Sequence, residues 1–201
     1  TDVTGVQTCA LPILKKKNLQ EFIRVCKTKL IFTILLSARI LIYRNMGNDS
    51  SFLKRALEIA VKSVDEGGGP FGAVIVRGNE IIAESSNNVV LKKDPTAHAE
   101  INVIRKASAV LGTHDLSDCI LYTSCEPCPM CLGAVYWAGI RKVVYASDRK
   151  DAAAAGFSDK LIYDEIILEP SARQIEFLHI PGCKWGEPFR KWNEYEGKIP
   201  Y

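Results

Sequence analysis

The sequence contains no charge-free apolar run long enough for a membrane helix. Residues 30–38 form the longest such run, about half of the roughly 20 residues that a spanning helix needs, and Arg39 ends it. Internal repeats and low-complexity segments are also missing, which excludes repeat architectures. The seven cysteines are odd in number and show no paired framework, so no disulfide scaffold is expected. These absences predict a globular protein of the reduced cytoplasm with no membrane partner.

Most of the chain has no excess of basic over acidic residues, although the formal net charge is +3. Residues 1–45 hold eight Lys or Arg against two acidic residues, whereas residues 46–201 hold 18 basic and 21 acidic residues. A domain that binds a run of phosphates needs a basic face. The larger part of the chain is mildly acidic, and we therefore predict no nucleic-acid partner.

Residues 1–45 differ in composition from the remainder and have two interpretations. They could be a membrane anchor, or a non-native translation upstream of the true start, and the shift in composition favours the second. The segment lacks a clear signal-peptide cleavage site, and its basic run lies far from the terminus. Met46 is a credible start because residues 48–51 resemble a helix cap. We expect residues 1–45 to be a non-native or disordered extension and residues 46–201 to form the folded domain.

Hydrophobic spacing in residues 46–201 predicts strands that alternate with helices. A helix over residues 51–66 ends at a Gly-Gly-Gly-Pro run, and two strands at residues 73–76 and 81–83 form a hairpin. Further helices are expected at residues 98–110, 128–138, 160–166 and 187–195, and further strands at residues 120–122, 142–145 and 174–180. This alternation predicts an α/β fold, a three-layer α/β/α sandwich.

Two short segments have the pattern of a catalytic zinc site that activates water against an amino group on a base. His98 stands two residues before Glu100, and a Pro-Cys-x-x-Cys motif supplies Cys128 and Cys131. These three ligands leave the fourth position of Zn²⁺ to water, as in catalytic sites. Helix N-termini favour the thiolate form that zinc requires. Glu100 is expected beside the metal, where a carboxylate can move protons.

Other interpretations of these residues remain open. Cys125 forms an overlapping Cys-x-x-Cys with Cys128, so that pair could be the ligands instead. A lone Cys-x-x-Cys is often a structural zinc knuckle, but no second pair is present, and the histidine has its own glutamate. Helical spacing places Trp137 in a core, and Phe71 could be core or a stacking platform.

Three stretches together resemble the cytidine-deaminase-like superfamily. They are Gly-Gly-Pro-Phe-Gly-Ala-Val-Ile-Val at residues 68–76, Asp-Pro-Thr-Ala-His-Ala-Glu at residues 94–100 and Cys-Glu-Pro-Cys-Pro-Met-Cys at residues 125–131. The zinc motifs are shared with tRNA adenosine deaminases, so they do not choose the substrate. The segments 151–159, 161–166 and 188–192 and the terminal Tyr201 resemble the bacterial guanine deaminases, and this similarity extends over about residues 46–201.

The resemblance implies a zinc-dependent deaminase domain that converts guanine, a small purine base, to xanthine and ammonia. The implied fold has a mixed five-stranded sheet between helices. One Zn²⁺ per subunit is implied, in a homodimer that exchanges C-terminal segments. One departure from the family pattern is Ser158, where relatives often have a second aspartate. The implied site residues are His98, Cys128 and Cys131 for zinc, Glu100 and Asp159 for proton transfer and the leaving amino group, and Phe71, Asn87, the Ala99 backbone N–H, Trp137 and Tyr201 for the substrate.

Three alternative functions are kept. A tRNA adenosine deaminase should carry a basic recognition surface, and residues 194–201 do not supply one. A guanosine deaminase would need room for a ribose, which residue types do not settle. A non-catalytic zinc module would have no use for Glu100 beside an open coordination position.

Overall fold

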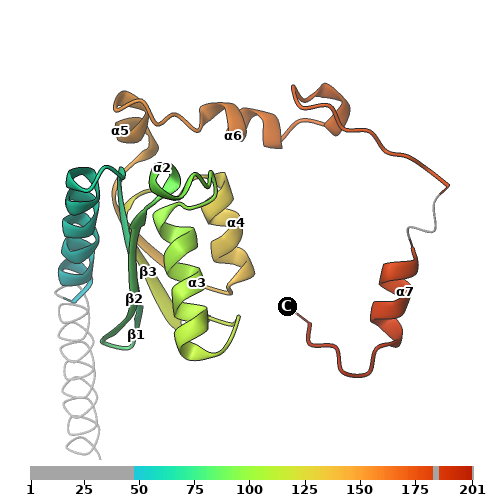
Figure 1. The fold of residues 1–201 in the computed structure, drawn as a ribbon, viewed down its shortest axis with the longest axis horizontal. Helices are drawn as coiled ribbons and strands as arrows, with labels where there is room; N and C mark the ends of the chain where they lie inside the picture. Colours follow the sequence, from blue (N-terminus) through green and yellow to red (C-terminus); the bar gives the residue numbers. More distant parts are fainter. Residues whose placement is uncertain (1–47, 183–185, 201) are drawn as a thin grey trace, which may run out of the picture. The chain divides into compact units, whose positions relative to one another are not determined.

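The computed structural model describes residues 48–182 and 186–200, and the expectations for residues 1–45 and for Tyr201 lie outside the described residues. Residues 48–65 are helical, so residues 48–51 lie within a helix and do not cap one. The elements that follow (Figure 1) are β1 (Gly69–Arg77), β2 (Glu80–Asn87), α2 (Val89–Lys92), α3 (Ala99–Leu111), β3 (Cys119–Cys125), α4 (Pro129–Trp137), β4 (Lys142–Ser147), α5 (Arg149–Ala154), α6 (Lys160–Ile166), a 3₁₀ turn (Pro170–Ala172) and α7 (Glu187–Glu194).

The strands form one mixed sheet in the order β2-β1-β3-β4. β1 pairs antiparallel with both β2 and β3, whereas β3 and β4 are parallel. The described residues contain four strands, and the prediction of a fifth at residues 174–180 is wrong for this protomer, because these residues make no strand ladder. The alternation of apolar residues there predicts an extended backbone but supplies no neighbouring strand, and a strand needs one.

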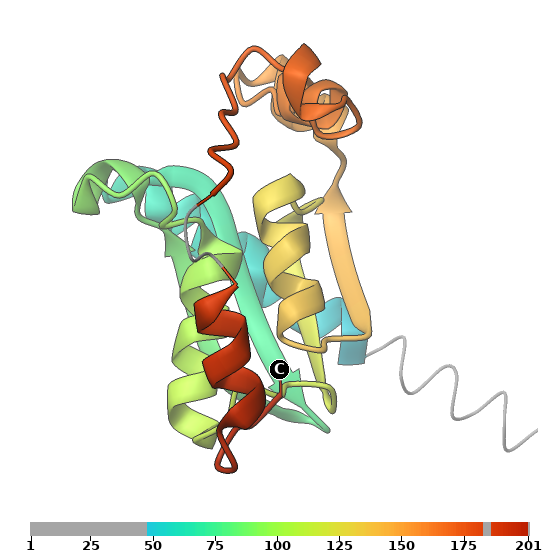
Figure 2. The same cartoon turned by 90° about the vertical axis from the view of Figure 1, so that its right-hand side faces the viewer.

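Two hydrophobic clusters lie on opposite faces of the sheet, because successive side chains of a strand point to opposite sides. Ala73 and Ile75 of β1 join the cluster under α3 and α4, whereas Val74 and Val76 join the cluster under the helix at residues 48–65. α3 and α4 lie side by side on their face of the sheet (Figure 2). The metal-site motifs meet at the end of the sheet that lies near the N-termini of α3 and α4.

Gly72 allows the helix at residues 48–65 to approach β1 closely. A Cβ atom at this position would lie 2.3 Å from the Ala56 carbonyl oxygen and 2.7 Å from the Ala60 backbone nitrogen. β1 also changes register between Gly69 and Gly72. Such irregularities re-aim neighbouring side chains, and Phe71 lies within this one.

The part of the chain after β4 has little burial. No residue of α5, α6 or α7 is buried. Within the described residues, no helix combines the length and apolar character needed to cross a membrane.

Candidate active site

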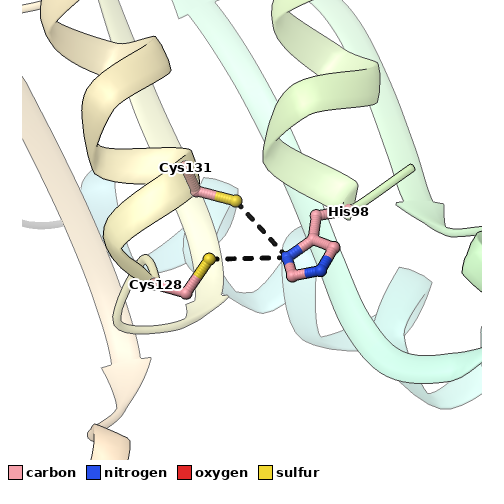
Figure 3. Close-up of side chains that lie close together, drawn as sticks. All are labelled: His98, Cys128 and Cys131. Carbon is pink, nitrogen blue, oxygen red and sulfur yellow. Dashed lines mark hydrogen bonds between the residues drawn. The ribbon is translucent and has the colours of Figure 1, made fainter. Parts of the chain in front are cut away.

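The N-termini of α3 and α4 bring the three predicted ligands together. His98 is the N-cap residue of α3, Cys128 is the N-cap residue of α4, and Cys131 lies in the first turn of α4 with Pro129 before it. The His98 Nδ1 atom lies 3.6 Å from the Cys128 Sγ atom and 3.5 Å from the Cys131 Sγ atom, and it faces both sulfurs (Figure 3). All three ligand atoms lie within 4.8 Å of one another.

These separations fit one tetrahedral Zn²⁺. Zn–S bonds of about 2.3 Å and Zn–N bonds of about 2.0–2.1 Å place tetrahedral sulfur and nitrogen ligands about 3.6 Å apart. Cys125 does not belong to the group, because it ends β3 and its thiol is 3.6 Å from the Asp148 carbonyl oxygen. The pair that can hold a metal together with His98 is therefore Cys128 and Cys131, and the group fits one Zn²⁺ per subunit.

The thiols of Cys128 and Cys131 are hydrogen-bonded to each other. A hydrogen bond from Cys131 lowers the pKa of Cys128 to about 4, against the effect of burial, and His98 lowers it further. The same hydrogen bond raises the pKa of Cys131. Because zinc binds thiolates, a bound cation would displace this remaining proton.

Glu100 lies in the first turn of α3 and is 5% exposed. Its Oε1 atom accepts a hydrogen bond of 3.0 Å from the Thr123 hydroxyl, and its Oε2 atom lies 3.5 Å from the Cys131 thiol. Burial raises the pKa of this carboxyl, although the hydrogen bonds oppose the shift. A carboxyl that is buried, oriented and adjacent to the ligand group can exchange protons inside the site.

A cavity of about 630 Å³ opens onto these groups. Asp159 stands at the start of α6 and lines the same cavity, and burial raises its pKa. The structure thus brings the two predicted acids to one cavity from distant parts of the chain. The predicted site residues in its lining are Phe71, Asn87, His98, Glu100, Cys128 and Asp159.

The predicted substrate contacts divide into two groups. Asn87 ends β2 with its Oδ1 atom accepting the Val89 N–H at 3.1 Å, and Ala99 begins α3, where helix geometry leaves the N–H without an intrahelical partner. Trp137 ends α4, is 67% exposed and does not line the cavity. It is therefore neither a core residue nor a wall of this protomer's cavity.

Among the lining residues that were not predicted as site residues, Phe157 supplies a second aromatic ring and Arg149 a cation. Phe157 packs edge-to-face on Phe71, with ring centroids 5.1 Å apart. Arg149 lines the cavity from the start of α5. Phe157 stands two residues before the predicted acid Asp159, and this proximity in the sequence could have identified Phe157 as a site residue. Arg149 has no motif around it, and only the fold brings it to the site.

Comparison with known proteins identifies a matching family model and similar proteins. The family model of the cytidine and deoxycytidylate deaminase zinc-binding region matches residues 46–147. Guanine deaminase of Bacillus subtilis (strain 168) is 53% identical over 155 residues, which are 77% of this chain and 99% of the relative. The crystal structure of guanine deaminase from that species covers 76% of this chain and 98% of its own, with a TM-score of 0.74.

Two further relatives share less of the chain. The tRNA-specific adenosine deaminase of Bacillus subtilis (strain 168) is 38% identical over 120 residues, 60% of this chain and 74% of the relative. A solved structure in complex with 2,6-diaminopurine is 39% identical and covers 55% of this chain and 62% of its own, with a TM-score of 0.53. The zinc-site geometry, the family model and the near full-length similarity agree, and the chain belongs to the cytidine and deoxycytidylate deaminase family.

Proposed function

We propose that the protein is a zinc-dependent guanine deaminase, a hydrolase that cleaves the exocyclic C–N bond of a cyclic amidine. The observation that carries the proposal is one cavity lined by His98 and Cys128 of the His-Cys-Cys group, by buried Glu100 and by Asp159. The 53% identity to a guanine deaminase over almost its full length supports guanine as the substrate. Residues 46–201 are proposed as the deaminase domain.

In the proposed reaction, water adds to C2 of guanine and ammonia leaves. When bound, zinc supplies a Lewis acid that lowers the pKa of water towards about 7. Glu100 takes a proton from the attacking water and gives it to the ring nitrogen beside C2 as the C–O bond forms. Asp159 protonates the amino group, the C2–N bond breaks to release ammonia, and the C2 hydroxyl gives its proton back to the Asp159 carboxylate as the C2 carbonyl of xanthine forms. The raised pKa of Asp159 favours the protonated form that this step needs.

The base would be held by the remaining predicted contacts. Phe71 offers an aromatic face within the cavity, and its contact with Phe157 fixes the ring. Asn87 offers its side-chain amide, and the Ala99 N–H points from the start of α3. A relative in complex with 2,6-diaminopurine supports a purine base as the ligand class.

We further propose a homodimer with exchange of C-terminal segments. The outer edge of β4 has no neighbouring strand among the described residues, and residues 174–180 expose Ile175, Phe177, Leu178 and Ile180. Exposed edges are ready to pair with another chain. Residues 174–180 of a second copy would complete a five-stranded sheet in a three-layer sandwich, and Tyr201 would close the neighbouring site. Light scattering coupled to size exclusion tests the dimer, and a monomeric mass at assay concentration would contradict it.

The alternatives are adenosine deamination in tRNA and deamination of guanosine. The tRNA-specific relative shares the zinc motifs, but the acidic balance of residues 46–201 disfavours RNA. A cytoplasmic location is proposed because the metal ligands need reduced thiols.

The deciding experiment incubates the zinc-loaded protein separately with guanine, guanosine, adenine, cytosine and a tRNA. Ammonia release is measured for each, and xanthine is identified by chromatography. Guanine should be the preferred substrate by at least tenfold in kcat/KM. A preference for guanosine or for tRNA would replace the proposal with the corresponding alternative.

A further inference from the structure

α5 and α6 carry Asp159 to the site with very little packing behind them. Neither helix has a buried residue, whereas α3 buries six. A group that acts on a substrate must be held within about 0.5 Å of its working position. Core packing cannot provide this for Asp159, so specific local contacts must.

The first of these contacts joins the two helices. The guanidinium carbon of Arg149, the first residue of α5, lies 4.9 Å from the centre of the Tyr163 ring in α6. Tyr163 follows Asp159 by four residues, about one helical turn, so the two positions lie on the same side of the helix. Tyr163 is half-buried and Arg149 is exposed, so this is a cation–aromatic contact of the solvent-accessible kind.

The second set of contacts ties both helices to the segment that carries a metal ligand. The Tyr163 hydroxyl donates to the Pro127 carbonyl oxygen at 3.5 Å, and Pro127 directly precedes Cys128. The Arg149 backbone N–H donates to the Glu126 Oε2 atom at 3.2 Å. α5 and α6 are therefore held against residues 126–128.

The charge and the location of Arg149 also connect this residue with Asp159. Arg149 and Asp159 both line the metal-site cavity and an adjoining cavity of about 350 Å³. Among the described residues that line the metal-site cavity, Arg149 is the only Lys or Arg. The titratable groups that act on Asp159 are Cys128, Glu126 and Tyr163 as well as Arg149, so Arg149 is the cation that balances this acidic group of side chains.

We propose that Arg149 and Tyr163 form the positioning element that holds Asp159 against the metal site. The inference rests on the proposed function, because it assumes that Asp159 acts on the leaving amino group. Both residues act through Asp159. Loss of either frees α6 to shift relative to Cys128 while the ligand group itself stays intact.

The test uses the zinc-loaded full-length protein and measures kcat, KM, zinc content and melting temperature. Arg149→Ala and Tyr163→Ala should each lower kcat about tenfold, with zinc content unchanged. Tyr163→Phe keeps the ring under Arg149 and loses only the hydroxyl contact with Pro127, so its kcat should lie between those of Tyr163→Ala and the unaltered protein. Lys150→Ala is the matched control, because Lys150 is the next residue of α5 and lines only the adjoining cavity; it should match the unaltered protein.

A double-mutant cycle with Asp159→Asn separates positioning from a general loss of stability. In the Asp159→Asn background, Arg149→Ala should cause little further loss of kcat. An equal tenfold loss in both backgrounds would overturn the inference, as would a full-rate Arg149→Ala variant beside a slow Asp159→Asn variant. A full-rate Asp159→Asn variant would instead overturn the proposed role of Asp159, and the inference with it.

Discussion

Replacing Glu100 by Gln should stop turnover while leaving the fold and the zinc in place. Gln has the shape of Glu, and its amide oxygen can still accept the 3.0 Å hydrogen bond from Thr123. The amide cannot take a proton from water or return it to the purine ring. General acid–base catalysis contributes roughly 10²–10⁴-fold, so we expect a loss of about 10³-fold in kcat, equivalent to about 4 kcal/mol of transition-state stabilisation.

The same contacts predict that Glu100→Gln has only a small effect on the stability of the fold. The contact of the second carboxyl oxygen with the Cys131 thiol is altered, and a neutral hydrogen bond contributes about 1 kcal/mol. Because burial disfavours the charged carboxylate and raises the pKa of Glu100, a neutral amide offsets part of that loss. The melting temperature should therefore change by no more than about 4 °C, since 1 kcal/mol shifts a domain of this size by roughly 2–4 °C.

The assay follows xanthine formation from guanine by chromatography, with zinc measured by elemental analysis in the same samples. Glu58→Gln is the control, because it removes a carboxylate that is half exposed on the helix at residues 48–65. Xanthine formation within about threefold of the unaltered protein, in a Glu100→Gln sample with full zinc, would refute the proton-transfer role.

Three other predictions follow from the site and the fold. Asp159→Asn should lower kcat at least about 100-fold, and it should remove a decline of kcat with rising pH, because burial raises the pKa of the acid that loses its proton as pH rises; an unchanged pH profile would contradict this. Cys131→Ala leaves two ligands, so elemental analysis should find less than one zinc per chain, and added Zn²⁺ should restore chelator-treated unaltered protein but not the variant. Gly72→Ala should destabilise the protein by about 1–3 kcal/mol in urea unfolding, because its Cβ would lie 2.3 Å from the Ala56 carbonyl oxygen. Gly133→Ala meets no atom within 4 Å and should not destabilise, so equal effects of the two glycine substitutions would refute the close-approach argument.

The sequence predicted the metal group well because its geometry is local. Cys128 and Cys131 are set by one helical turn, and His98 and Glu100 by positions two residues apart at the start of another helix. Only the meeting of the two helices is a long-range event, and the mixed sheet supplies it. The overlapping Cys125 pair could not be rejected from spacing, because the end of β3 decides which way that thiol points.

Prediction from the sequence failed where a residue's environment depends on parts of the chain that are far away in the sequence. Trp137 has the spacing of a core residue, but α4 ends there and the ring is exposed. The strand expected at residues 174–180 has the right alternation and no partner strand in the described protomer. Arg149 has no motif, and it enters the site only because α5 starts where β4 ends.

The absence of buried residues in α5 and α6 also determines which parts of the site open most easily. Segments without a buried face open locally at a free-energy cost far below that of global unfolding. Amide hydrogens of α6 should therefore exchange with solvent much faster than those of α3, whose opening would disturb the metal ligands. Brief displacement of α6 would give the proposed product a route out, while the His-Cys-Cys group stays assembled.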